Sequence, residues 1–134
     1  MKIMSQIHLW LILLLLITFS IIYSCSSPNT GGAVSSASAK IVTCPTTTST
    51  SVSISQSAFQ PPNVSITVND IVKWTNNDSI THTVTSGTPG SQDGNFDSGN
   101  LTPNTSVCIQ FLAAGSYSYF CTIHVFMTGI VKVQ

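Results

Sequence analysis

Seven short segments of the chain alternate apolar and polar residues, and this alternation limits the fold more than any other feature. They are SVSIS (51–55), NVSITV (63–68), DIVKWT (70–75), THTVT (81–85), SVCIQF (106–111), SYSYFC (116–121) and GIVKV (129–133). A period of two is typical of half-buried strands, and the stretches between them are rich in turn-forming Gly, Pro, Asn and Asp. We therefore predict an all-β fold, a two-sheet antiparallel Greek-key sandwich of seven to eight strands.

The same alternation predicts which side chains face the core. Successive side chains of a strand point to opposite faces, so Trp74 should share an inward face with Val72. The face that carries Tyr119 also carries Cys121, and His82 lies on an inward-facing position of its segment. A thiol and an imidazole are thus expected inside an apolar shell.

The N-terminal 25 residues indicate export. Residues 9–23 are almost wholly apolar, and this run of about 15 residues is shorter than the roughly 20 that a membrane-spanning helix needs. It fits the core of a secretory signal. The sequence IYSC, which ends at Cys25, resembles a lipoprotein signal and would make Cys25 the acylated first residue. The alternative is an uncleaved membrane anchor. Either interpretation places the protein outside the cytoplasmic membrane, periplasmic or on the outer surface, and membrane-anchored.

Composition divides the rest of the chain and excludes one class of partner. Residues 26–40 are mostly Ser, Gly, Ala and Pro, a composition typical of a flexible tether, which leaves residues 41–134 for one folded domain. Charged residues make up 6% of the chain, against about a quarter in ordinary proteins. Without a basic stripe, nucleic acid is not expected as a partner, and we expect a monomer.

One cluster of residues can carry chemistry. Beyond Cys25 the chain has two histidines, His82 and His124, and one methionine, Met127. Cys121 stands three residues before His124, which stands three before Met127. His82 lies 39 residues upstream of Cys121. Each residue alone could be ordinary core filling, but the joint spacing favours a metal site.

The types of ligand distinguish between the alternatives. Zinc prefers four strong ligands and has little use for a thioether. A cysteine nucleophile needs a histidine base and an open pocket, and Met127 would occupy that place. A disulfide of Cys121 suits an oxidising compartment but leaves both histidines and the methionine without a role. Two histidines, one cysteine and a weak methionine form the blue-copper electron-transfer set.

Two stretches resemble the cupredoxins, small type 1 copper proteins, and in particular their plastocyanin/amicyanin-like branch. They are AFQPPNVSITVNDIVKWTNNDSITHTV (58–84) and AAGSYSYFCTIHVFMTGIVKV (113–133). The resemblance covers roughly residues 52–133. Two positions depart from the branch: Val125 stands where proline is frequent, and Asn69 where glycine is usual.

The resemblance implies a role for each residue of the cluster around one type 1 copper ion. The equatorial ligands would be His82, Cys121 and His124, and Met127 the axial one. Thr83 follows the first ligand, and its hydroxyl is expected to tie that loop to Thr122. Such outer contacts hold metal ligands in place.

The resulting hypothesis is a membrane-tethered electron-transfer protein, not an enzyme. Electrons would pass through His124 at an apolar docking patch with Val125 and Phe126, during transient contact with a redox protein donor and acceptor. Two other functions stay open. One is copper storage or delivery with the same ligands, and the other is a metal-free adhesion or structural module.

Two further cysteines lie outside the cluster. Cys44 lies before the first predicted strand, and Cys108 should point away from the core because Val107 and Ile109 point inward. In an exported domain, two such cysteines suggest a disulfide that fastens the N-terminal arm to the sheet. The alternative is two unpaired thiols.

Overall fold

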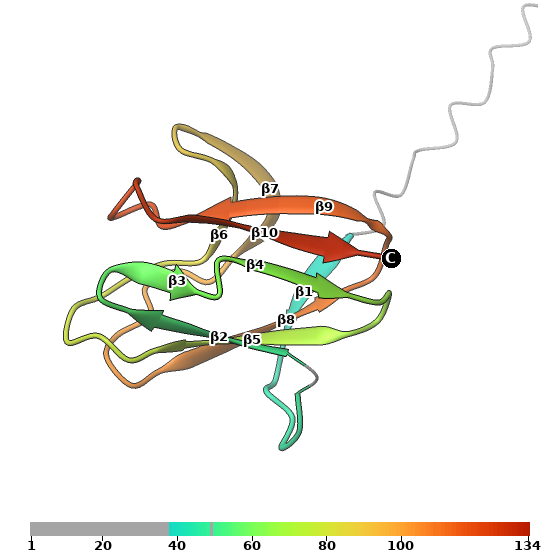
Figure 1. Ribbon diagram of the computed structural model, residues 1–134, viewed down its shortest axis with the longest axis horizontal. Helices are drawn as coiled ribbons and strands as arrows, with labels where there is room; N and C mark the ends of the chain where they lie inside the picture. Colours follow the sequence, from blue (N-terminus) through green and yellow to red (C-terminus); the bar gives the residue numbers. More distant parts are fainter. Residues whose placement is uncertain (1–37, 49) are drawn as a thin grey trace, which may run out of the picture. The chain divides into compact units, whose positions relative to one another are not determined.

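The computed structural model describes residues 38–48 and 50–134 (Figure 1). The predicted signal of residues 1–25, with Cys25, and residues 26–37 of the predicted tether lie outside the described residues. The described residues form ten strands: β1 (Ala39–Val42), β2 (Thr50–Ser55), β3 (Ala58–Gln60), β4 (Asn63–Ile66), β5 (Ile71–Asn76), β6 (Thr85–Thr88), β7 (Ser91–Asp97), β8 (Ser106–Phe111), β9 (Gly115–Phe120) and β10 (Thr128–Val133). Across the described ranges, no helix has the length and apolar character needed to cross a membrane.

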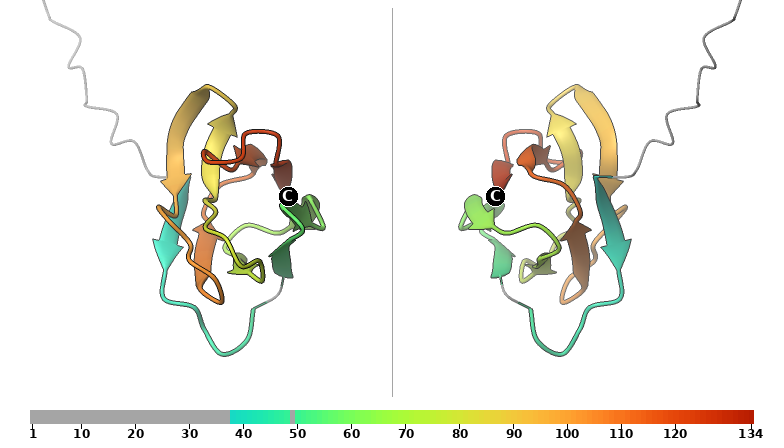
Figure 2. Two further views of the ribbon diagram at one scale, coloured as in Figure 1. Left: turned by 90° about the vertical axis from the view of Figure 1, so that its left-hand side faces the viewer. Right: turned by 90° about the vertical axis from the view of Figure 1, so that its right-hand side faces the viewer.

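The strands form two facing sheets, seen end on in Figure 2. One sheet has the order β1-β8-β5-β2-β3, and the other β4-β10-β9-β6-β7. The predicted all-β sandwich is confirmed, with ten strands instead of seven to eight. Most neighbours are antiparallel, but β2 pairs with β5 and β4 pairs with β10 in parallel.

Three strands lie outside the segments predicted from alternation. β1 begins at Ala39, two residues inside the predicted tether, and the three-residue β3 is too short to show a period. β7 runs through a stretch predicted as a turn. Alternation does not reveal this strand because Phe96 is its only buried side chain. The strand predicted at 81–85 is wrong in position, since β6 begins at Thr85 and His82 lies in the preceding loop.

Aromatic rings fill the space between the sheets. Tyr119 packs edge-on against Phe59, with ring centroids 4.8 Å apart, and against Trp74 at 5.4 Å. Trp74 and Tyr119 are buried, as the alternation predicted. The alternation of residues 63–68 predicts that Val68 shares the inward face of Val64 and Ile66, but Val68 is exposed because β4 ends at Ile66. The packed rings give the site a rigid base, since core packing approaches crystal density.

A disulfide joins Cys44 to Cys108, with their Cα atoms 5.1 Å apart. Cys108 is buried but stands outside the main core cluster. Its neighbour in register on β1 is Val42, so the bridge fastens the N-terminal arm to β8 on the outer side of the sheet.

Two loops at one end of the sandwich carry the candidate ligands. The first, residues 77–84, follows β5, and the second, residues 121–127, joins β9 to β10. β5 and β8 are antiparallel partners in register at Thr75 and Ser106, so the end of β5 lies beside the start of β8. The loops lie at the left of Figure 1, away from the C-terminus.

Candidate metal centre

The first loop is fixed by backbone and side-chain hydrogen bonds. His82 and Leu101 exchange two backbone hydrogen bonds, of 3.1 and 2.8 Å, as an isolated antiparallel bridge. The buried Asn76 side chain donates to the carbonyl oxygens of Ile80 and Leu101 at 2.8 and 2.9 Å. Because a buried amide without partners is costly, these contacts specify the path of the loop and turn His82 inward.

The second loop closes on itself. The Cys121 amide donates to the Met127 carbonyl at 3.1 Å, and the Met127 amide donates to the His124 carbonyl at 2.9 Å. Two short backbone bonds therefore bring the two ends of the Cys-His-Met stretch together. Met127 is buried, at 3% exposure, and Cys121 is fully buried.

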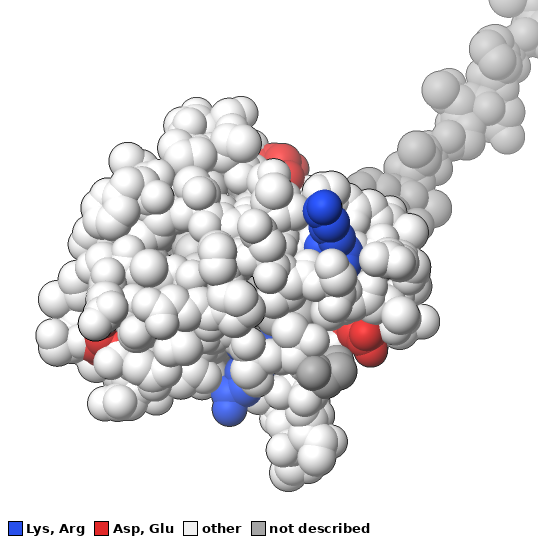
Figure 3. Space-filling model, viewed as in Figure 1, with Lys and Arg blue, Asp and Glu red and all other residues white. Residues whose placement is uncertain are grey.

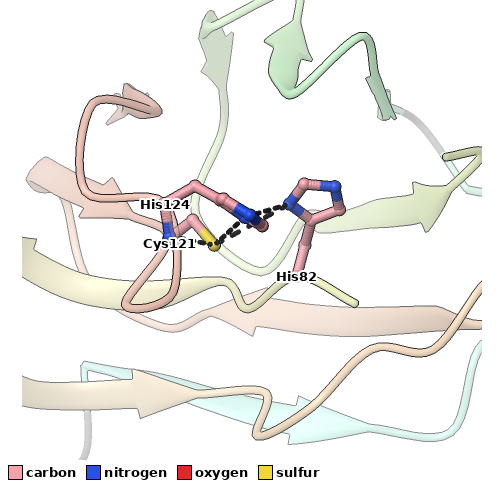
Figure 4. Close-up of side chains that lie close together, drawn as sticks. All are labelled: His82, Cys121 and His124. Carbon is pink, nitrogen blue, oxygen red and sulfur yellow. Dashed lines mark hydrogen bonds between the residues drawn. The ribbon is translucent and has the colours of Figure 1, made fainter. Parts of the chain in front are cut away.

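The three strongest donors converge from the two loops (Figure 4). The Cys121 Sγ lies 3.8 Å from the Nδ1 of His82 and 3.8 Å from the Nδ1 of His124. The two Nδ1 atoms are 3.1 Å apart, and one ligand atom from each residue falls within 4.8 Å of the others. Side chains separated by 39 residues of sequence thus present their ligand atoms to one point.

The sulfur of Cys121 is held by two backbone amides. Thr83 N–H donates to Sγ at 3.3 Å, and His124 N–H donates at 3.4 Å. Such donors fix the position of the sulfur, and cysteine binds metals through this atom as the thiolate. Each amide comes from a different loop, so the sulfur also links the loops.

A carboxylate contacts the far side of the His82 ring. Asp78 Oδ2 lies 2.9 Å from the Nε2 of His82. The Asp78 carboxylate also accepts the backbone N–H groups of Gln56 and Ser57, at 2.7 and 2.8 Å, from the turn between β2 and β3. Burial raises the pKa of Asp78, but the hydrogen bonds from Ser57, Gln56 and His82 outweigh it and hold the pKa below its usual value.

Sequence analysis missed Asp78 as a functional residue. The available signal was its position four residues before His82 in a short loop. The two amides that anchor it come from residues 56 and 57, which no local pattern connects to that loop.

Thr83 and Thr122 lie together beside the sulfur. Their hydroxyl oxygens are 3.1 Å apart, and the Thr122 amide donates to Thr83 Oγ1 at 2.8 Å. Thr83 follows His82 and Thr122 follows Cys121, so this contact joins the two loops next to their ligands.

An apolar surface surrounds the outer histidine. His124 is half-buried, while Val125 and Phe126 are 53% and 71% exposed. Ile123 on the same loop and Ile80 on the first loop are also exposed. Among the described residues, four of the six exposed large hydrophobic side chains lie on the two ligand-bearing loops.

The donor set fits copper. Two imidazole nitrogens and one cysteine sulfur converge, and a buried methionine ends the same loop. Soft sulfur ligands with imidazole suit copper, whereas a methionine adds little to a zinc site. Cys121 and Met127 belong to the same buried core cluster as Trp74 and Tyr119.

Comparison with known proteins gives a consistent result. Residues 46–134 match the family of copper binding proteins described as the plastocyanin/azurin family. The chain is 35% identical over 86 residues to amicyanin-alpha from Methylorubrum extorquens, a match that covers 64% of this chain and 72% of that protein.

Solved structures show the same fold. A Cu(I) form of an amicyanin mutant superposes with a TM-score of 0.64 at 24% identity, over 72% of this chain and 99% of that one. A purple cupredoxin from Nitrosopumilus maritimus superposes with a TM-score of 0.59 at 28% identity, over 63% of this chain and 99% of that one.

Proposed function

The chain belongs to the plastocyanin/azurin family of copper-binding proteins, and on that basis we propose that it is an exported blue copper electron-transfer protein. The resemblance to the cupredoxins predicted from the sequence is confirmed. Proteins of this kind carry electrons and are not enzymes. The observation that carries the proposal is the convergence of His82, Cys121 and His124 within 4.8 Å.

The residues that would hold the copper are His82 and His124 through their Nδ1 atoms, Cys121 through its Sγ, and Met127 as the weak fourth ligand. When bound, copper supplies a one-electron couple between Cu(II) and Cu(I). Two histidines and one cysteine with a weak axial methionine are the ligand set of such sites. Burial of Met127 at the end of the ligand loop supports its place in the set.

The protein's own residues keep the ligands in one arrangement. The amides of Thr83 and His124 hold the sulfur, and Asp78 accepts from Nε2 of His82. With the proton on Nε2, the Nδ1 lone pair of that ring is free for a metal. Ligands that are fixed before the metal changes charge need little rearrangement when an electron arrives or leaves.

We propose that electrons enter and leave at His124. His124 is half-buried and is followed by two exposed apolar neighbours, Val125 and Phe126. A redox protein donor and acceptor would dock there in turn, through a small and transient contact. The chain is proposed to act as a monomer.

Attachment to a membrane is a separate part of the proposal. It rests on the apolar run of residues 9–23 and on Cys25, both outside the described residues. An acyl chain on Cys25 or an uncleaved anchor would keep the domain at the outer side of the membrane.

The first experiment is an absorption spectrum of the chain from residue 26 onward, titrated with Cu(II), beside Cys121→Ser. We expect an intense blue charge-transfer band at one copper per chain that is absent from the mutant. Reversible reduction with retained copper would support electron transfer, while ready copper release would favour storage or delivery. A purple colour would point to a site like that of the Nitrosopumilus maritimus cupredoxin, and a colourless product would refute the proposal.

A further inference from the structure

A chain of hydroxyl groups runs from the ligand loops to a carboxylate on β7. Thr122 Oγ1 lies 3.1 Å from Thr83 Oγ1, which lies 3.1 Å from Thr85 Oγ1. Thr85 Oγ1 lies 2.9 Å from Oδ1 of Asp97, which also accepts the Gly99 amide at 3.0 Å. The site as described so far does not use Thr85 or Asp97.

Two of these hydroxyl groups are buried, so the loss of their hydrogen bonds would be costly. Thr83 and Thr85 are buried at 4% and 1% exposure, whereas Asp97 is exposed. Thr85 and Asp97 are partners in register between β6 and β7. A buried hydroxyl that loses its partner keeps the cost of its desolvation. The two threonines therefore depend on the Asp97 carboxylate, the last group in this series of hydrogen bonds.

The Thr85 hydroxyl has one proton and two acceptors within reach. An ionised carboxylate only accepts, and each hydroxyl has one proton to donate. Thr85 is oriented to donate to Asp97 Oδ1 at 2.9 Å and to Thr83 Oγ1 at 3.1 Å, so its proton serves one of these acceptors at a time. The Thr83 oxygen accepts the Thr122 amide at 2.8 Å and lies 3.1 Å from the Thr122 hydroxyl.

We propose that Thr85 and Asp97 are positioning residues of the copper site, acting through Thr83 on the sulfur of Cys121. The inference rests on the proposed function and extends it to residues that touch no ligand. Thr83 is the point of action because its amide donates to the Cys121 Sγ. The hydroxyl chain fixes Thr83 from sheet β4-β10-β9-β6-β7, while Asp78 fixes His82 from the β2–β3 turn.

The test compares the full-length protein with variants that remove single links. Thr85→Val removes the hydroxyl and keeps the shape, Thr85→Ser keeps the hydroxyl, and Asp97→Ala removes the acceptor. Matched controls are Thr75→Val, which breaks a 2.9 Å hydroxyl contact with Ser106 on the other sheet, and Asp93→Ala, which removes another carboxylate of β7. Because Asp97 is exposed, its variant should fold even if Thr85→Val does not.

The readouts are the copper affinity, measured by competition with a chelator, and the position of the visible charge-transfer band. Outer contacts of metal ligands typically contribute about 10–100-fold in affinity, so we expect Thr85→Val and Asp97→Ala each to weaken binding about tenfold and to shift the band. Thr85→Ser and both controls should match the wild type. The double variant should be no weaker than either single one, because both remove the same chain.

Two outcomes would overturn the inference, and they differ in what else fails. If Thr85→Val and Asp97→Ala lower only the melting temperature of the apoprotein, with wild-type affinity and band, the role is structural and the proposed function stands. If the wild type itself shows no charge-transfer band, the proposed function and this inference fail together.

Discussion

Asp78 determines which nitrogen of His82 faces the other ligands. A carboxylate can only accept a hydrogen bond, so the contact at 2.9 Å favours the tautomer with the proton on Nε2. The carboxylate is itself fixed by the amides of Gln56 and Ser57. The β2–β3 turn therefore fixes the Asp78 carboxylate, and this carboxylate fixes the orientation of the buried His82 imidazole.

Removal of Asp78 should weaken copper binding without abolishing the fold. Asp78→Ala leaves the buried Nε2 of His82 without its acceptor, and we expect the affinity to fall about 10–100-fold. Asp78→Asn keeps an oxygen that can accept and should restore much of the loss. Competition with a chelator measures both variants. Equal affinities for wild type and Asp78→Ala would show that the ring is held by its packing alone.

Gly129, on β10 just after the ligand loop, has no room for a Cβ atom. A Cβ at this position would lie 2.3 Å from the Pro62 carbonyl oxygen and 2.4 Å from Cζ of Tyr119. Real atoms do not approach so closely, and the Tyr119 hydroxyl donates to that same carbonyl at 2.9 Å. Glycine is therefore required for close approach of β10, β9 and the start of β4.

Gly129→Ala should destabilise the protein by roughly 1–3 kcal/mol through overpacking. The exposed neighbour Thr128→Ala is the control, because its side chain meets no such contact. Urea unfolding of the apoproteins gives the free energy of unfolding for each. Equal stability of the two variants would mean that β10 can move away from Pro62 at no cost.

At the scale of elements, strong alternation made part of the fold predictable. β8 was predicted at its observed bounds because Val107, Ile109 and Phe111 face the core. The Cys-His-Met spacing likewise identified the loop after β9. β7 was not predictable from alternation. It is a sheet-edge strand of mostly polar, exposed residues, and its partner β6 consists of small residues.

The contacts that orient the site were the least predictable part of it. They join positions far apart in sequence, as when the Gln56 amide donates to Asp78. Sequence spacing shows which ligands can occur in one loop. It does not show which amide or carboxylate the rest of the fold will bring to them, because tertiary pairing decides that.

The disulfide between the N-terminal arm and β8 should stabilise the domain independently of the copper site. Cys44 and Cys108 are separated by 64 residues, and closing a loop of this length would stabilise by roughly 4 kcal/mol if it acts by restricting the unfolded chain. The double variant Cys44→Ser, Cys108→Ser should unfold at lower urea concentration with an unchanged visible spectrum. We expect no effect on the spectrum because the disulfide lies outside the core cluster. An altered spectrum would show that the disulfide and the copper site are not independent.

For the whole molecule, the described domain has two functionally different ends. Ser38 accepts the Leu112 amide just beyond β8, and the Gln134 amide bonds to Ile66 at the end of β4. β8 runs from Ser106, near the ligand loops, to this opposite end. Ser38, where the described domain begins, therefore lies at the end opposite the apolar surface around His124.

The domain's sparse charge should make its electron exchange nearly independent of salt. Outside Lys2 the chain has three lysines and four aspartates, and most of the face in Figure 3 carries no charge. The proposed docking through Val125 and Phe126 would bury apolar area, which salt does not screen, whereas steering by charge weakens as the Debye length shortens. We expect the self-exchange rate between oxidised and reduced copies to change less than about twofold between roughly 50 and 500 mM salt.

Phe126→Ser tests the same surface. At 71% exposure, this side chain can be truncated without disturbing the fold, so the visible spectrum should not change. The self-exchange rate should fall about tenfold at every salt concentration, as expected when an interface loses one aromatic anchor. Val68→Ser, which truncates an exposed side chain just beyond β4, should exchange at the wild-type rate. A steep fall of the wild-type rate with salt, or a Phe126→Ser rate equal to wild type, would place the electron-exchange surface elsewhere on the domain.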